Sequence, residues 1–113
     1  MAALIRVLVV DDQALVRQGI RSLLDLCPEI EIAGEADDGD TALEALERAR
    51  PDVVLLDLKM PRLDGLSVLR ALRERPGSPA VLVLTTFDDV DLLLDAIRSG
   101  ARGYLLKDVT LEQ

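Results

Sequence analysis

Short apolar runs alternate along the chain with segments whose apolar residues recur at helical spacing. The apolar runs have strand length and cover residues 5–10, 30–36, 52–57, 80–85 and 102–106. The runs at 52–57 and 80–85 are almost entirely apolar, which is typical of parallel strands covered on both faces, whereas 30–36 alternates like an edge strand. The pattern therefore predicts strands at all of these positions.

The segments between the runs carry apolar stripes that predict four amphipathic helices. The stripes consist of Leu15, Val16, Ile20, Leu23 and Leu24, then Ala42, Leu43, Ala45, Leu46 and Ala49, then Leu66, Leu69 and Leu72, and finally Val90, Leu93, Leu94 and Ile97. Successive helical positions lie about 100° apart. At least one of the consecutive residues Leu92, Leu93 and Leu94 is therefore predicted to be surplus to the core.

Local signals mark the ends of these helices. Thr41 followed by Glu44 predicts a capping box at the start of the second helix, with Asp38 or Asp40 as the alternative cap. Gly100 is placed to end the fourth helix in a left-handed conformation.

Strict alternation of strands and helices predicts an α/β fold with a doubly wound parallel sheet and right-handed crossovers. For five strands the usual order is 2-1-3-4-5, the flavodoxin-like arrangement. The 113 residues suffice for one core and are too few for two ordinary domains. A fifth helix begins at Thr110 and stops at Gln113, so this helix is predicted to be truncated or missing.

Composition narrows the possible functions. The formal charge of −8 would repel a nucleic-acid backbone, so the chain alone is not expected to bind DNA. The sequence contains no histidine, which excludes a histidine-based triad, a histidine-ligated metal and a phosphohistidine carrier on this chain. Cys27 has no partner cysteine, and no signal peptide or long apolar run is present, so a cytoplasmic protein without a membrane segment is expected.

Three carboxylates occupy corresponding positions at the ends of two strands. Asp11 and Asp12 directly follow the first strand, and Asp57 ends the third. In the order 2-1-3-4-5 these strands are neighbours about 4.8 Å apart, so the acids should converge. One aspartate after a strand is more often a loop residue or a helix cap, but three together require a cation. Oxygen ligands alone favour Mg²⁺.

The ends of the last two strands add complementary groups. Thr85 ends the fourth strand and Lys107 follows the fifth, which places a hydroxyl and an ammonium at the same edge. Each alone is more commonly a strand residue or a solvated charge. Together with the acids they are typical of phosphoryl chemistry, in which one carboxylate attacks phosphorus to form an aspartyl phosphate.

With these strand-end residues, the chain resembles the receiver domain of bacterial two-component response regulators. The motifs that carry the resemblance are "DD" after the first strand, "LLDLKMPRLDG" around the third, "LT" after the fourth and "GYLLKD" after the fifth. The segments "GEADDGDTALE", "LTTFDD" and "GARGYLLKD" are most similar to the NarL/FixJ subfamily. The resemblance implies a receiver domain over residues 1–113, with the LuxR-type helix-turn-helix output domain of the family absent from this sequence.

The resemblance also implies a role for each acidic residue. Asp57 would be the phosphoacceptor, Asp12 would ligate Mg²⁺ directly, and Asp11 would act through bound water or by orienting the site. The backbone carbonyl of Lys59 would be a further ligand. The donor would be the phosphohistidine of a sensor histidine kinase, which agrees with the missing histidine.

Three further residues take roles from the same resemblance. Thr85 would bond a phosphoryl oxygen, Lys107 would pair with the phosphate, and Tyr104 would be the switch aromatic that turns inward with Thr85 on activation. The protein would form a homodimer on activation and control transcription through an output domain that binds DNA. It would catalyse only its own phosphorylation and dephosphorylation, and so would not be an enzyme.

Two alternatives remain open. A small Mg²⁺-dependent phosphatase also uses a strand-end aspartate as nucleophile, but it normally places a second acid two residues later, whereas Asp11 and Asp12 are adjacent. A pseudo-receiver would signal by protein contact without phosphorylation. Retention of Asp57, Thr85 and Lys107 argues against that reading.

Overall fold

The computed structural model describes residues 4–58, 65–75, 77–85 and 90–106, which form five strands and four helices. In chain order these are β1 (Ile5–Val10), α1 (Ala14–Leu24), β2 (Ile30–Ala36), α2 (Gly39–Ala49), β3 (Val53–Asp57), α3 (Gly65–Arg73), β4 (Ala80–Thr85), α4 (Val90–Arg98) and β5 (Gly103–Leu106). The strands predicted at 5–10, 30–36 and 80–85 are confirmed to the residue. The predicted helix start at Thr110 lies outside the described residues. Within the described ranges, no helix has the length and apolar character needed to cross a membrane.

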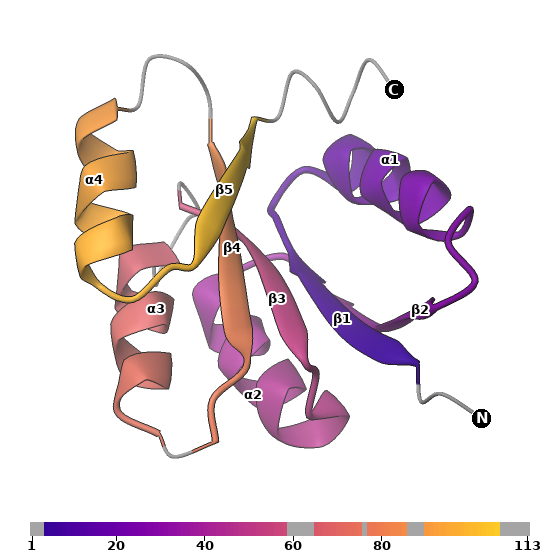
Figure 1. Ribbon diagram of the computed structural model, residues 1–113, viewed down its shortest axis with the longest axis horizontal. Coiled ribbons are helices and arrows are strands. Elements are labelled where there is room, and N and C mark those ends of the chain that lie inside the picture. Colours follow the sequence, from indigo (N-terminus) through magenta and orange to yellow (C-terminus); the bar gives the residue numbers. More distant parts are fainter. Residues whose placement is uncertain (1–3, 59–64, 76, 86–89, 107–113) are drawn as a thin grey trace.

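All strands are parallel and belong to one sheet of order β2-β1-β3-β4-β5, as predicted. Figure 1 shows this twisted sheet running through the middle of the molecule. In the register, Val10 lies beside Leu56, and Asp57 lies beside Leu84. Residues that follow β1 and end β3 are therefore brought to one edge of the sheet.

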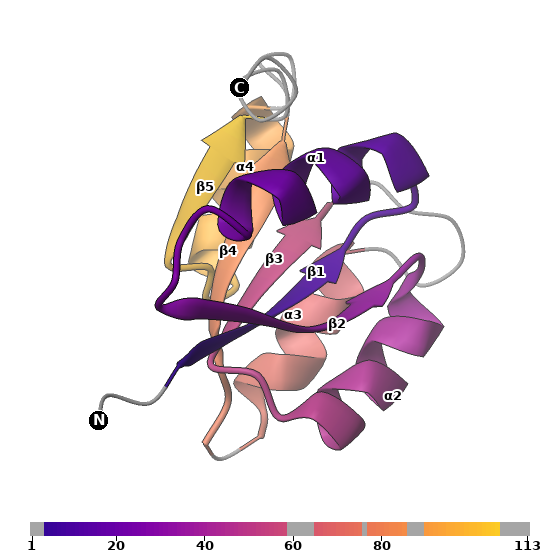
Figure 2. The same ribbon diagram turned by 90° about the vertical axis from the view of Figure 1, so that its right-hand side faces the viewer.

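The sheet separates two apolar layers, because alternate strand residues point to opposite faces. On one face α1 packs alone among the described helices, as Figures 1 and 2 show. The buried residues of that layer are Val7, Val9, Val16, Ile20, Leu55 and Leu84. The opposite face is covered by α2, α3 and α4 and holds the larger cluster, in which Leu8, Val10, Val54, Leu56, Val68 and Val83 are fully buried.

The start of α2 distinguishes between the predicted caps. The Asp38 carboxylate accepts a hydrogen bond from the Thr41 N–H at 2.8 Å, and the Thr41 hydroxyl accepts one from the Asp38 N–H at 3.3 Å. Asp38 is the N-cap of α2, which confirms one of the two alternative caps predicted from the sequence. The pairing of Thr41 as cap with Glu44 is wrong, because Thr41 lies inside the helix. Gly100 has a φ of 114° after α4, as its predicted positive-φ role requires.

The predicted apolar stripe of α4 is wrong in part. Ala96 is fully buried, and Leu92 and Leu93 pack against the larger core cluster. The exposed apolar side chains of this helix are Val90, Leu94 and Ile97. The side of α4 that faces the core is therefore the one that carries Leu92, Leu93 and Ala96. The surplus leucine of the sequence prediction is therefore Leu94, which is 45% exposed.

The predicted stripe of α1 is also too broad. Val16 and Ile20, four positions apart, are buried against the sheet, but Leu15 is 71% exposed. Leu15 and Val16 point about 100° apart around the helix, because they are one position apart in the sequence. A helix that contacts the sheet along one side therefore buries Val16 and leaves Leu15 exposed.

Candidate functional site

Two neighbouring strands bring three carboxylates to one edge of the sheet. Asp57 is the last residue of β3, and Asp11 and Asp12 follow β1 directly. The pairing of Val10 with Leu56 places Asp11 and Asp57 at equivalent positions on adjacent strands. One carboxylate oxygen from each acid lies within 4.8 Å of the others, so the convergence expected from the strand order is confirmed.

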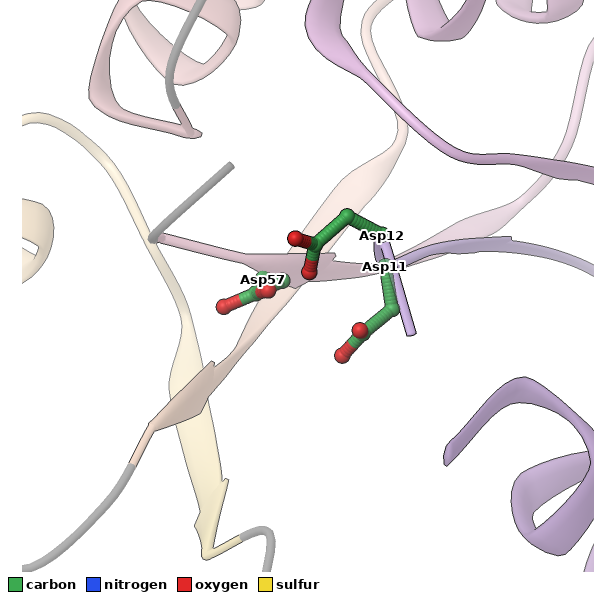
Figure 3. A group of neighbouring side chains, drawn as sticks. All are labelled: Asp11, Asp12 and Asp57. Atoms are coloured by element: carbon green, nitrogen blue, oxygen red, sulfur yellow. The ribbon is translucent and has the colours of Figure 1, made fainter. Parts of the chain in front are cut away.

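The acids differ in their surroundings. Asp11 is fully buried and Asp57 is 2% exposed, whereas Asp12 is exposed at the rim. Figure 3 shows the Asp12 carboxylate turned toward Asp57, with Asp11 beside them. The cluster thus has a buried floor of two carboxylates and an accessible third one, an arrangement that an ion can enter from solvent.

Electrostatics explains what such a cluster can hold. Two unit charges of the same sign at about 4 Å repel by about 4 kcal/mol at an effective dielectric constant of about 20. A divalent cation replaces this repulsion by attraction. The donor set consists of carboxylate oxygens and the chain has no histidine, so the residues fit a hard ion such as Mg²⁺ rather than zinc.

Hydrogen bonds hold the turn that carries the acids. The Asp11 N–H donates to the Ala36 carbonyl at 3.1 Å, which continues the pairing of β1 with β2. The Asp11 carboxylate accepts a hydrogen bond from the Gln13 N–H at 2.8 Å. Arg17 of α1 donates from Nη1 to the Asp11 carbonyl oxygen at 2.5 Å. Arg17 was not among the residues predicted from the sequence, since the contact joins a side chain to a backbone atom and leaves no pattern of residue types.

Gly65 is a second residue that the sequence analysis did not single out. It begins α3, and a Cβ atom at this position would lie 2.4 Å from the Asp57 carbonyl oxygen and 2.6 Å from the Leu58 Cα. Its N–H donates to the Leu58 carbonyl at 3.3 Å. Only glycine permits this approach of α3 to the end of β3. The glycine in "PRLDG" was the available signal.

Of the remaining predicted site residues, the structure describes Tyr104 fully and Thr85 only in its backbone. The Thr85 backbone ends β4 and pairs with Leu106 at the same edge as the acids, but the described part of the chain does not include the Thr85 side chain. Tyr104 lies on β5 beside Val83 and is 51% exposed. Lys59 and Lys107 lie outside the described residues.

One hollow formed by the described residues lies away from the acidic cluster. It encloses about 720 Å³ at the opposite end of the sheet, between α2 and the segment that follows α3. Its walls include Pro51 and Asp52 before β3 and Ser78 and Pro79 before β4. The acidic cluster instead lies at the carboxyl ends of the strands, where open α/β sheets bind their ligands.

Comparison with known proteins agrees with this geometry. The sequence matches the family model of the response regulator receiver domain over residues 7–113. It is 38% identical over 106 residues to the nitrate/nitrite response regulator protein NarL of Escherichia coli K12, covering 94% of this chain and 49% of that protein. It is 42% identical over 106 residues to the probable transcriptional regulatory protein NarL of Mycobacterium tuberculosis H37Rv, again covering 94% and 49%.

The solved structures give the same result. The signal receiver domain of the response regulator NarL from Mycobacterium tuberculosis superposes with a TM-score of 0.88 at 37% identity, covering 98% of this chain and 93% of that one. The chain spans about half the length of the curated relatives it matches. The family model and the superposed structure each cover nearly all residues of the chain, and the acidic cluster lies where the fold predicts it. The chain therefore belongs to the response regulator receiver domain family, with NarL-type regulators among its relatives.

Proposed function

We propose that this chain is a phosphoacceptor receiver that takes a phosphoryl group from a sensor histidine kinase onto Asp57. The observation that carries the proposal is the approach of the Asp11, Asp12 and Asp57 carboxylates to within 4.8 Å at the carboxyl ends of adjacent strands. Asp57 ends β3 and is nearly buried, so its carboxylate is fixed in direction. A fixed nucleophile reduces the entropy cost of transfer.

Mg²⁺ is the proposed cofactor. The Asp11, Asp12 and Asp57 carboxylates would hold it, with the Lys59 backbone carbonyl as a further ligand. When bound, the ion offsets the negative charge of the acids and of the phosphoryl oxygens. Asp12 is the accessible member of the set, so we assign direct ligation to it, while the buried Asp11 would act through bound water or by orienting the site.

The chain's own residues perform the transfer. A carboxylate oxygen of Asp57 forms a bond to phosphorus while the bond from phosphorus to the donor histidine nitrogen breaks, and the electron pair leaves with that nitrogen. Thr85 then donates a hydrogen bond to a phosphoryl oxygen, and Lys107 pairs with the remaining negative charge. The chain catalyses its own phosphorylation and dephosphorylation and acts on no other substrate.

The experiment that tests this proposal is intact mass spectrometry after incubation with magnesium chloride and acetyl phosphate. A labile adduct of one phosphoryl group is expected in the natural chain and is expected to be absent in Asp57→Ala. Asp25→Ala, which removes an exposed acid just after α1, is the matched control and should keep the adduct. Turnover of acetyl phosphate without an adduct would instead indicate a phosphatase, and neither result would indicate a pseudo-receiver.

We further propose a switch that involves Thr85 and Tyr104. Tyr104 is half exposed in this structure, and its register partner Val83 places it on the face covered by α2, α3 and α4. A phosphoryl group adds about −1.5 to −2 charges and three acceptor oxygens, toward which Thr85 moves. The ring of Tyr104 then turns inward, in an equilibrium that exists before phosphorylation and that the phosphate biases.

NMR on the chain with beryllium fluoride and Mg²⁺ tests the switch. The Tyr104 ring signals are expected to shift toward those of a buried ring, and the backbone amides that follow Thr85 are expected to shift with them. Unchanged Tyr104 signals in a sample that has bound beryllium fluoride would contradict the switch.

The output is proposed from the relatives. The Mycobacterium tuberculosis relative is a probable transcriptional regulatory protein, and both curated relatives compared above are about twice as long as this chain. We propose that phosphorylation promotes a homodimer and that a separate output domain contacts DNA, since a net charge of −8 disfavours binding by the receiver itself.

A further inference from the structure

A partly buried network of charges joins the start of α1 to β2, next to the acidic cluster. The Arg17 side chain is 19% exposed, and its Nε lies 3.3 Å from Oε1 of Glu35. The other carboxylate oxygen of Glu35 lies 3.1 Å from Nη2 of Arg21. With Nε directed at Glu35, Arg17 presents Nη1 to the Asp11 carbonyl oxygen at 2.5 Å. The guanidinium therefore bridges β2 and the turn that carries the acids.

Three consecutive peptide groups cross that turn, and each makes a hydrogen bond. The peptide before Asp11 donates to the Ala36 carbonyl, and the peptide after Asp12 donates to the Asp11 carboxylate through the Gln13 N–H. The peptide between the two acids accepts from Arg17. This middle peptide leads directly into the Cα of Asp12, so its orientation sets the direction of the one exposed carboxylate in the cluster.

The two arginines that share Glu35 are not equivalent. Arg21 is 55% exposed, and its ion pair with Glu35 is of the kind that contributes little to stability. Removal of Arg17 leaves Glu35 paired with Arg21, so the specific loss is the bond to the Asp11 carbonyl. The hydrogen bond from Arg17 holds the backbone that precedes the proposed metal ligand Asp12. Loss of a hydrogen bond that orients a metal ligand typically weakens metal binding about 10- to 100-fold.

We infer that Arg17 is a positioning residue for the metal and phosphoryl site, which it serves by holding the peptide between Asp11 and Asp12 through the Asp11 carbonyl. The inference rests on the proposed function, because it concerns the same acidic cluster. Glu35 orients the Arg17 guanidinium by pairing with Nε. In this role Arg17 acts through Asp12 and is not itself a ligand of the ion.

The test compares Mg²⁺ affinity, measured by isothermal titration calorimetry, in Arg17→Gln and in the matched control Arg21→Gln. Both changes remove one positive charge and one Glu35 pairing, but only the first removes the Asp11 contact. We expect the dissociation constant to rise about tenfold or more in Arg17→Gln and less than about twofold in Arg21→Gln. Arg17→Lys, which keeps the charge and one donor, should recover part of the loss.

A second readout separates positioning from general stability. Without Mg²⁺, hydrogen exchange at the Asp12 amide should accelerate in Arg17→Gln relative to amides in the centre of β1, and it should be unchanged in Arg21→Gln. Equal affinities for Mg²⁺ in Arg17→Gln and the natural chain would overturn the inference while leaving the proposed function intact. If Arg17→Gln does not fold, Arg17→Lys decides: a partial loss of Mg²⁺ affinity with faster exchange at the Asp12 amide supports the inference, whereas natural affinity with natural exchange would overturn it. Failure of the natural chain to bind Mg²⁺ would overturn both.

Discussion

Asp12 is open to solvent while Asp11 and Asp57 are buried, so the three acids do not contribute equally to the site. An ionised carboxylate in water keeps its hydration, whereas a buried one relies on nearby donors. The buried Asp11 has such a donor in the Gln13 N–H. At the scale of single residues, Asp12 is therefore the acid whose removal should weaken metal binding with the least effect on folding.

Asp12→Asn is expected to raise the dissociation constant for Mg²⁺ by at least about tenfold, which corresponds to about 1.4 kcal/mol. The physical reason is the loss of one of the three carboxylate charges that would face the ion. The free energy of unfolding without metal should be unchanged or higher, because repulsion within the cluster decreases. Calorimetric titration and urea denaturation measure the two quantities.

Glu29→Gln provides the control for this substitution. It removes the same charge from an exposed position between α1 and β2, away from the cluster. Mg²⁺ affinity should be unaffected. A similar loss of affinity in both variants would mean that net charge, rather than ligation by Asp12, governs the binding.

At the scale of the element, α3 is tied to the site through its first residue. Gly65→Ala is expected to destabilise the protein by about 1 to 3 kcal/mol and to slow adduct formation at Asp57, since the new Cβ would lie 2.4 Å from the Asp57 carbonyl oxygen. Helix propensity alone predicts the opposite sign, because alanine favours helices over glycine by about 1 kcal/mol. Urea denaturation and mass spectrometry measure both effects.

Gly34→Ala is the matched change in a strand. There the added Cβ would meet only the end of the Leu8 side chain at 3.4 Å, so no backbone atom has to move. Adduct formation should be unaffected. An unchanged or increased stability of Gly65→Ala would show that α3 can move away from β3 without cost.

The rotation of α4 gives a second prediction at this scale. Leu69→Ala in α3 should cost about 2 to 5 kcal/mol of unfolding free energy, since Leu69 is 2% exposed. Leu94→Ala in α4 should cost less than about 0.5 kcal/mol, since Leu94 lies on the exposed side. A large cost at Leu94 would mean that α4 faces the sheet with the stripe predicted from sequence.

At the scale of the whole molecule, Mg²⁺ is expected to raise the melting temperature. An ion that binds only the folded state at ten times its dissociation constant adds about 1.4 kcal/mol, because RT ln 11 has this value. Asp11 and Asp12 follow β1 and Asp57 ends β3, far apart in the sequence, so the unfolded chain offers no equivalent site. Thermal denaturation with magnesium chloride, compared with potassium chloride at equal ionic strength, measures the effect.

Asp12→Asn should lose most of this stabilisation, which ties the effect to the acidic cluster. If the variant and the natural chain gain equally from Mg²⁺, the ion acts elsewhere on the surface. Equal stabilisation by both salts in the natural chain would point to screening of the net charge of −8.

Much of this architecture is encoded in short segments of the sequence. Apolar runs of strand length, helical stripes and carboxylates at strand ends are properties of short segments, and the rules for parallel sheets convert them into the order β2-β1-β3-β4-β5. The convergence of Asp11, Asp12 and Asp57 follows, because strand order alone decides which strand ends are neighbours. The sequence by itself therefore determined the fold and the position of the acids.

Other features were decided only by the tertiary structure. The contact of Arg17 with the Asp11 carbonyl, the approach of Gly65 to Asp57 and the outward face of α4 all depend on how a helix is placed and rotated against the sheet. The apolar residues of α4 lie on more than one side of the helix, so their periodicity does not specify its rotation. The rotation is decided by close packing in the core, where Ala96 is buried. Side-chain bonds to backbone atoms leave no residue pattern, and only the folded chain brings their partners together.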